Sequence, residues 1–333
     1  MQTRRAFANI HYRGREYPTL DFSYTDNNDI TDDISATVAD KDDKWITELF
    51  PEIGEVVHAA MHLTNWNGIG DNRSSNLFSF EIDNPSYNGP FTINAVSVPI
   101  THSARSEKKN RSWRQILLSG IAGDFATNAG LRLFYDTSVD PFYDNIDQND
   151  KSDLQFLQEL CKSDGLSMKI SNGQLIIFEE WKYEQAPSVM TIEKGQKNII
   201  GKPKFNRNSK DVYRAAEITF FNPQDDVTYV GFFEDTSAFA VGHIFRDRER
   251  FNSVRDDINL DRKARARLRE KNKNQWTIRM TLTGDITYFA GTNVDIVGWG
   301  RFDGKYHIVS CSHKIKNAGY TVKLNLRRCL EGY

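Results

Sequence analysis

Two acidic pairs beside aromatic residues are the strongest candidates for catalytic chemistry in this sequence. Glu179 and Glu180 precede Trp181, and Glu234 and Asp235 follow two phenylalanines. Two carboxyl groups that flank one bond can cleave a glycoside by acid and base catalysis. Glu179 and Glu180 end a predicted strand, however, and neighbouring residues of a strand point to opposite faces. We therefore predict surface acidic residues and assign no catalytic residue.

One group of residues could form a metal site. His307, Cys311 and His313 share one face of a predicted strand and are residue types that bind metals. A two-residue turn at residues 317–318 would place Cys311 opposite Leu324. The face then reads as an apolar core with histidines at its ends: Val309, Cys311, Val322, Leu324 and Leu326. Cys311 is predicted to be a buried structural thiol, and no metal is assigned.

Other ligand-binding motifs are incomplete. The acidic stretch from Asp26 to Asp33 lacks the central glycine and the bidentate glutamate of a calcium loop. It is predicted to be a solvated loop. "NGIGDN" has two of the three glycines of a dinucleotide loop, and the sequence contains neither G-K-[ST] nor G-x-S-x-G. No cofactor is predicted.

The most basic segment runs from Asp261 to Lys273 and contains seven lysines or arginines from Arg262 onward. Such a segment could bind phosphates. Alternatively, it forms a solvated or salt-bridged helix face with the acidic residues interspersed in it. Aromatic residues that could stack on bases are missing from the segment, which favours the second interpretation.

Composition indicates a globular protein. The chain has 333 residues, a net charge of -2, 39% hydrophobic and 26% charged residues. No run approaches the roughly 18 apolar residues of a membrane-spanning helix. Three distant cysteines indicate a reducing compartment rather than a disulfide framework. The N-terminus shows no apolar segment after its basic residues, so no secretory signal is expected.

Two segments in the middle of the chain have the same predicted plan of a helix, a glycine and a strand. Each helix begins at a Ser-x-x-Gln capping box and ends at a glycine. The first box starts at Ser112 and its glycine is Gly130, whereas the second starts at Ser152 and its glycine is Gly165. We interpret the two segments as copies of one unit.

The second unit continues into a hairpin. Asn172 and Gly173 are predicted to form its type I′ turn. The helix would cover one face of this hairpin and bury Cys161 in the core. The other face leaves Ile176 and Phe178 uncovered, and they are expected to contact the first unit or a neighbouring subunit. The expected partners in the first unit are Leu131 and Leu133.

An irregular phenylalanine-rich stretch is a second candidate for a subunit contact. Its phenylalanines are Phe232, Phe233, Phe239 and Phe245. Such residues could equally belong to the core or to an oligomer interface.

Both ends of the chain are predicted to be strands and turns. A basic helix at about 256–273, with Leu260, Ala264 and Leu268 on its apolar stripe, interrupts the C-terminal strands. The fold class is therefore α+β, mostly β. The predicted divisions are 1–105, an α/β middle domain at 106–188, and 189–333.

Four segments in this order resemble the late control D-type tail proteins, which are baseplate hub proteins of contractile phages and phage-like bacteriocin particles. They begin at "VADKDDKW", at "INAVSVPITHSARSEKKNRSW", at "SDLQFLQEL" and at "VDIVGWGRFDGKYHI". The resemblance implies two tail-tube-like β-barrels, at 1–105 and at 189–333, the second built from 190–250 and 275–333.

The resemblance also implies a structural role without enzymatic activity. Family hubs are homotrimers whose ring adapts a three-fold spike to the six-fold tail tube and nucleates tube assembly. Expected partners are a second and third copy, a separate central spike protein, the tail tube protein, baseplate wedge proteins and the tape measure. The protein would be made in the bacterial cytoplasm and incorporated into a tail, without membrane insertion or specific nucleic-acid binding. The alternatives are a peptidoglycan hydrolase and a wall-binding tail component.

Overall fold

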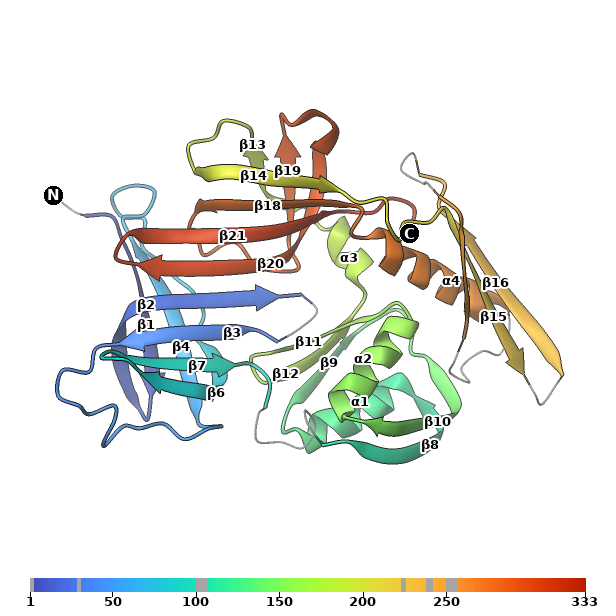
Figure 1. Cartoon of the computed structure of the whole chain (residues 1–333), viewed down its shortest axis with the longest axis horizontal. Coiled ribbons are helices and arrows are strands. Elements are labelled where there is room, and N and C mark those ends of the chain that lie inside the picture. Colours follow the sequence, from blue (N-terminus) through green and yellow to red (C-terminus); the bar gives the residue numbers. More distant parts are fainter. Residues whose placement is uncertain (1–2, 29–30, 100–106, 223–225, 238–241, 250–256) are drawn as a thin grey trace.

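The computed structural model describes residues 3–28, 31–99, 107–222, 226–237, 242–249 and 257–333. The protein is mostly β and consists of one long sheet, a mixed α/β middle region and a small sheet beside the longest helix (Figure 1). Within the described part of the chain, no helix is long and apolar enough to cross a membrane.

The N-terminal strands pair in a closed ring. Their order is β1-β4-β6-β7-β3-β2, and β2 pairs back with β1. The strands are β1 (Arg5–Tyr12), β2 (Arg15–Asn27), β3 (Asp33–Val38), β4 (Val56–Thr64), β6 (Phe78–Tyr87) and β7 (Phe91–Val96), with the short β5 (Arg73–Ser74) on β4. Alternation decides which face is buried, since Ile34 and Ala36 of β3 point into the ring while Ser35 and Thr37 point out.

The C-terminal strands extend the same sheet. They are β13 (Ser188–Glu193), β14 (Ile199–Arg207), β18 (Trp276–Thr283), β19 (Asn293–Val297), β20 (Gly304–Lys316) and β21 (Gly319–Arg328). β20 pairs with β2, which places His313 opposite Tyr24. Both ends of the chain therefore share one thirteen-stranded sheet and one continuous core. The division into two tube-like barrels remains a prediction.

The last hairpin has the predicted register near its turn and a bulge further along. Cys311 lies opposite Leu324 and is fully buried, which confirms the structural thiol. The register shifts between Ile308 and Ser310. Ile308 rather than the predicted Val309 is therefore buried in the core.

The middle region packs its helices on two small sheets around a core of its own. One sheet pairs β8 with β10, and the other has the order β11-β12-β9. The elements are β8 (Lys109–Leu117), α1 (Leu118–Asn128), β9 (Arg132–Asp136), β10 (Phe142–Lys151), α2 (Asp153–Ser163), β11 (Ser167–Ser171), β12 (Gln174–Phe178) and α3 (Glu180–Gln185).

The two predicted helix starts have different outcomes. Ser152 caps α2, and its side chain accepts a hydrogen bond from the Gln155 amide. Ser112 is not a cap, because it lies inside β8 opposite Asp147 of β10. Pairing with a distant strand overrides the local capping signal, and α1 begins only at Leu118.

Both helices end in the same geometry. Gly130 and Gly165 have φ of 67° and 75°, the left-handed region that favours glycine. The amides of Leu131 and Leu166 each donate to a carbonyl of the last turn at 2.8 Å. Gly165 also permits close packing, because a Cβ there would lie 2.6 Å from that of Ala266.

A separate three-stranded sheet lies beside the long helix. It consists of β15 (Ala215–Asn222), β16 (Val227–Glu234) and β17 (Ile244–Arg248), and the helix is α4 (Asp257–Asn272). Leu260, Ala264 and Leu268 form the buried stripe of α4, as predicted. These strands had been assigned to the second barrel, but they form their own sheet, one face of which covers the apolar stripe of α4.

Candidate functional site

Three of the four candidate catalytic carboxylates have structural partners. Glu179 precedes α3 instead of ending a strand, and it accepts hydrogen bonds from the amide and hydroxyl of Ser138 at 3.0 and 2.8 Å. Asp235 accepts a hydrogen bond from the Tyr333 hydroxyl at 2.8 Å. Glu234 accepts a hydrogen bond from Arg214 Nε at 2.7 Å. Glu179, Glu180 and Asp235 are buried, so the prediction of surface acidic residues is wrong for these three. Glu234 is partly exposed, with 38% of its side chain accessible.

The fourth carboxylate, Glu180, belongs to a buried group of charges that we call the central ion cluster, formed by Glu180, Glu184, Arg269 and Arg327. Arg327 Nη2 lies 2.9 Å from Glu180 Oε2 and 2.5 Å from Glu184 Oε1. Arg269 also contacts both carboxylates. Burial by itself would raise the pKa of Glu180, but Arg327 and its neighbours hold that pKa well below its usual range. A carboxyl group in this state is poorly suited to act as a general acid.

The buried histidines belong to hydrogen-bond networks. His307 lies 2.9 Å from the Asn293 side chain and 3.4 Å from that of Asn28. His313 lies 2.6 Å from the Tyr320 hydroxyl. Burial lowers the pKa of both imidazoles to about 4, so they are neutral at pH 7. No three His, Cys, Asp or Glu residues among those that the structure describes are placed to hold a metal ion.

The basic helix α4 is salt-bridged, which confirms the favoured interpretation. Lys263 is fully buried, and its Nζ lies 2.9 Å from Asp164 and 3.4 Å from Glu249. Arg262 also pairs with Asp164, and Arg267 pairs with Glu249. The acidic partners come mainly from the end of α2 and the end of β17, whereas the sequence pointed to acidic residues within the helix itself.

The prediction of a solvated acidic loop is wrong for Asp26 and Asp32, whereas Asp33 is exposed and Asp29 lies outside the described residues. Asp26 and Asp32 are 2% and 1% exposed, and Lys169 of β11 contacts both, with 3.1 Å between its Nζ and Asp32. Burial raises the pKa of Asp32 to about 6 even though Lys169 opposes the shift. This ion pair fastens the middle region to the N-terminal ring. Roughly 140 positions separate its partners, a distance over which no sequence pattern pairs residues.

The uncovered hairpin face does not contact the residues that the sequence indicated. β12 pairs in parallel with β9, which places Ile176 opposite Phe134 and Leu175 opposite Leu133. Leu131 and Leu133 pack with the helix-covered core instead. Neighbouring strand residues point to opposite faces, and this register moves Leu133 away from Ile176.

The hairpin face that carries Ile176 and Phe178 lines an open cavity of about 430 Å³ between the middle region and the long sheet. Phe178 is only 5% exposed, because the Tyr183 ring packs against its edge at 5.2 Å. Phe134 is half exposed at the cavity mouth, beside Ile176. Asn28 and other polar residues complete the lining. The cavity is therefore an apolar recess that an additional side chain could fill.

The phenylalanine-rich stretch divides between core and surface. Phe233 and Phe245 pack on the α4 side of the small sheet. The Phe233 ring lies 5.7 Å from that of Tyr333, and the Phe245 ring lies 5.2 Å from that of Tyr213. Phe232 is 44% exposed on the opposite face of the small sheet, where Ile244 is also exposed. Phe239 lies outside the described residues. Phe232 is thus the member of the stretch that is placed to contact another molecule.

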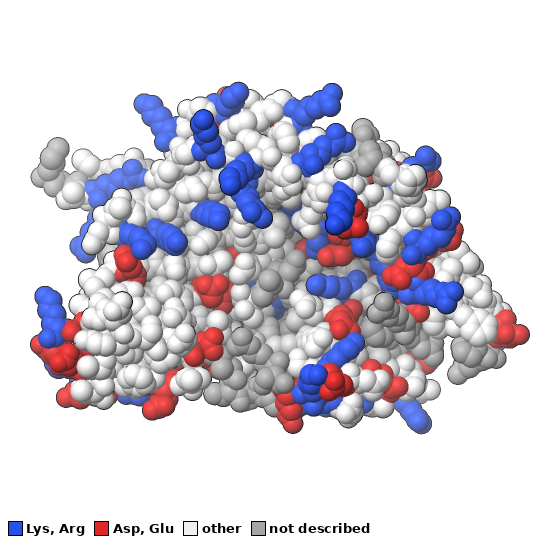
Figure 2. Space-filling model, viewed as in Figure 1, with Lys and Arg blue, Asp and Glu red and all other residues white. Residues whose placement is uncertain are grey.

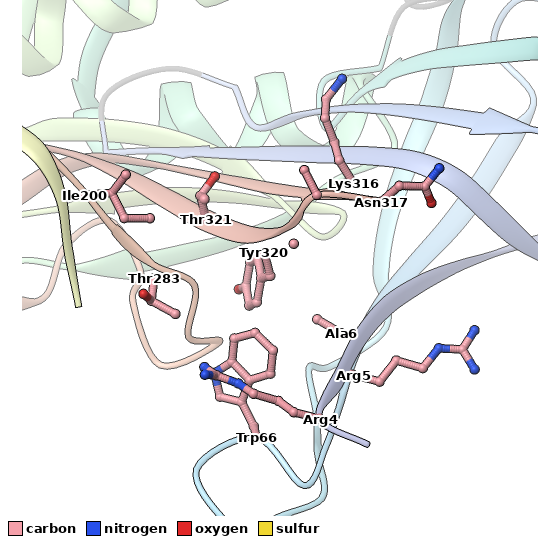
Figure 3. Close-up of a pocket in the computed structure, with 12 residues that line it drawn as sticks. Arg4, Arg5, Ala6, Trp66, Ile200, Thr283, Lys316, Asn317, Tyr320 and Thr321 are labelled. Atoms are coloured by element: carbon pink, nitrogen blue, oxygen red, sulfur yellow. The ribbon is translucent and has the colours of Figure 1, made fainter. Parts of the chain in front are cut away.

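A hollow of about 470 Å³ lies beside the turn of the last hairpin (Figure 3). Arg4 extends across the Trp66 indole, with its guanidinium carbon 3.8 Å from the ring centroid. Tyr320 stands next to Trp66, and Arg5 and Lys316 lie around the opening. The residues that line the hollow include no aspartate or glutamate.

Comparison with known proteins identifies the fold. The tail protein of Neisseria meningitidis MC58 aligns with a TM-score of 0.69 and 13% identity, over 97% of this chain and 96% of that chain. The 43 kDa tail protein of prophage MuSo2 from Shewanella oneidensis gives 0.67 and 13%, over 97% and 98%. The E. coli c3393 protein, a type VI secretion component described as similar to T4 tail proteins gp27 and gp5, gives 0.56 and 13%, over 97% and 78%.

The chain therefore has the fold of phage tail proteins and of related secretion components, and the resemblance noted in the sequence is confirmed. A family model described as YQBQ-like matches residues 248–327, which include α4, β18, β19 and β20. No curated protein sequence matches the chain.

Proposed function

We propose that this protein is the structural baseplate hub of a contractile tail or a related injection particle. The observation that carries the proposal is the alignment of nearly the whole chain with nearly the whole of two phage tail proteins. The structural partners of the candidate carboxylates support a role that depends on shape rather than on catalysis. In this role, the described surfaces bind other particle proteins.

The proposed assembly is a homotrimer. Each subunit contributes two tube-like barrels, one from the closed ring of β1 to β7 and one from the C-terminal strands, so that three subunits present six barrels. The two helix–glycine–strand units are proposed copies of one element between these barrels. The ring would join a spike below to the tail tube above, with wedge and tape measure proteins as further partners, and become part of the finished particle.

Light scattering of the purified chain, alone and with its spike protein, tests the proposal. We expect a mass of three 38.3-kDa chains. A chain that stays monomeric at every concentration, with and without the spike, would contradict the hub role. Electron microscopy of the particle would then show whether six barrel densities surround the axis.

A wall-degrading activity is the second candidate, because the tails of some particles must cross a cell wall and acidic pairs stand beside aromatic residues here. The central ion cluster speaks against it, since Glu180 is ionised and buried with two arginines. Release of soluble fragments from purified peptidoglycan by the intact protein, abolished by Glu180→Gln, would support a hydrolase. We expect no release.

A further inference from the structure

Four exposed cations form a diagonal row across four neighbouring strands of the long sheet. They are Lys204 of β14, Arg279 of β18, Lys323 of β21 and Lys314 of β20. Lys204 lies directly opposite Arg279. Arg279 lies opposite Asn325, two residues from Lys323. Lys314 lies opposite Thr321, again two residues from Lys323. Such diagonal neighbours are about 7–8 Å apart, so the row is a closely spaced line of positive charge.

The four strands that carry this row provide no counter-charge. The strands β14, β18, β20 and β21 contain no aspartate or glutamate at any position. None of the four cations pairs with an acid elsewhere in the described chain, and like charges directly opposite each other destabilise a sheet. The pair Lys204 and Arg279 therefore weakens the free protein and would be relieved by a bound anion.

The sheet changes its electrostatic character beyond β20. Asp21 of β2, Asp33 of β3 and Glu81 of β6 belong to the strands that follow in the order of the sheet. Figure 2 shows blue side chains spread over the upper half of the molecule, where β14, β18 and β21 lie, and most red side chains in the lower half. The cations are thus concentrated on one half of a continuous sheet, while the whole chain has a net charge of only -2.

The side chains beside the row are short hydrogen-bonding groups. The outward positions next to the cations are occupied by Thr281 and Thr283 of β18, Thr321 and Asn325 of β21, and Ser310 and Ser312 of β20. Ile200 of β14, opposite Thr281, is an exposed aliphatic exception. Protein interfaces usually contain a larger buried aromatic or aliphatic centre than one isoleucine. Lysine, arginine, serine, threonine and asparagine are the side chains that contact nucleic-acid phosphates.

We propose that this half of the sheet binds the phosphate backbone of a nucleic acid without sequence specificity. The hollow of Figure 3 would extend the surface, because Thr283, Thr321 and Lys316 line it and its other cations are Arg4 and Arg5. The sequence had pointed to the basic helix as the candidate for phosphate contacts. In the structure, Lys263 and Arg267 of α4 neutralise buried carboxylates, whereas the four cations of the row stay exposed.

Fluorescence anisotropy of the full chain with a labelled oligodeoxynucleotide, single-stranded and duplex, tests the proposal between about 50 and 200 mM salt. We expect binding that weakens as salt rises, with similar affinity for unrelated sequences. The variant Arg279→Gln/Lys323→Gln should weaken binding and make the salt slope shallower by roughly 1 per cation removed. The control variant Lys41→Gln/Lys44→Gln removes the same amount of positive charge from an exposed loop elsewhere. It should leave the affinity for the oligonucleotide and the salt slope unchanged.

Three outcomes would overturn the proposal: no binding at low salt, equal losses in the two double variants, and displacement of the oligonucleotide by polyglutamate at equal charge concentration. The third outcome would identify an acidic protein segment as the occupant. Circular dichroism spectra that match the unmodified chain would confirm that both variants fold. None of these measurements depends on trimer formation. The proposal of nucleic-acid binding can therefore be refuted without refuting the hub role, and the reverse also holds.

Discussion

Arg327 Nη2 lies 2.9 Å from Glu180 Oε2, although the two residues are 147 positions apart. Arg327 is the next-to-last residue of β21 and is 1% exposed, and Glu180 begins α3. A buried charge without its partner is costly, because the interior cannot replace the water that it has lost. This contact therefore ties the middle region to the long sheet.

Replacement of Glu180 by glutamine should destabilise the protein by about 3 kcal/mol, because buried Arg327 would lose one of the two carboxylates that it contacts among the described residues. Chemical denaturation measures the change as a lower midpoint. Glu159→Gln is the matched control, since the Glu159 side chain is 38% exposed and pairs with Lys151, which is itself 36% exposed. Its effect should stay below about 1 kcal/mol. Equal effects would show that the cluster does not hold the parts together.

The buried histidines should make the protein sensitive to mild acid. Burial lowers the pKa of His307 and His313 from 6.5 to about 4 in the folded state. Between these pH values the unfolded chain binds more protons than the folded one, so the free energy of unfolding falls as pH drops. Each histidine contributes at most about 1.4 kcal/mol per pH unit. Denaturation curves from pH 7 to 4 should show this loss, and His313→Asn should reduce the slope.

Asp32 gives a control of opposite sign. Burial raises its pKa to about 6, so the folded state binds more protons than the unfolded chain between its ordinary pKa and that value. Its contribution favours the folded state at low pH and is lost as pH rises to 6. Asp32→Asn should therefore steepen the acid destabilisation that His313→Asn reduces. Two variants that shift the slope in the same direction would refute this assignment.

Gly231 of β16 permits the close approach of α4. A Cβ at this position would lie 2.2 Å from the backbone carbonyl carbon of Leu260. Gly231→Ala should separate the helix from the small sheet and destabilise the protein by about 3 kcal/mol. Gly123→Ala in α1 meets open space and should instead stabilise by about 1 kcal/mol. Thermal unfolding of the two variants compares these opposite effects directly.

Phe232 should contribute to assembly if the exposed face of the small sheet contacts another subunit. Phe232→Ser would remove a 44% exposed aromatic side chain without opening the α4 core. We expect trimer association to weaken by about 2 kcal/mol, as measured by sedimentation. Tyr87→Ser removes a similarly exposed ring from β6 and should have little effect. Unchanged association of the Phe232 variant would exclude this face from the interface.

Local features were predictable because they depend on neighbouring residues. Ser152, Gly165 and the turn at Asn172 lie within the helix and hairpin that the sequence indicated. The buried stripe around Leu260 was equally clear, since its 3.6-residue spacing needs no knowledge of the partner. Ser112 shows the limit, because the same capping pattern is overridden when a distant strand pairs with that segment.

The amino-acid pattern alone predicts the mostly β character, the glycine ends of the helices and the pairing of the last hairpin, because propensity, capping and turn chemistry act over a few residues. Three further features depend on long-range packing: the two ends of the chain share one sheet, Lys169 contacts Asp26 and Asp32, and Arg327 contacts Glu180. The packing of the whole chain also pairs Lys263 and Arg267 of α4 with buried carboxylates and leaves Lys204, Arg279, Lys314 and Lys323 of the sheet exposed. These outcomes depend on which distant charges and strands meet, and that is decided when the whole chain packs.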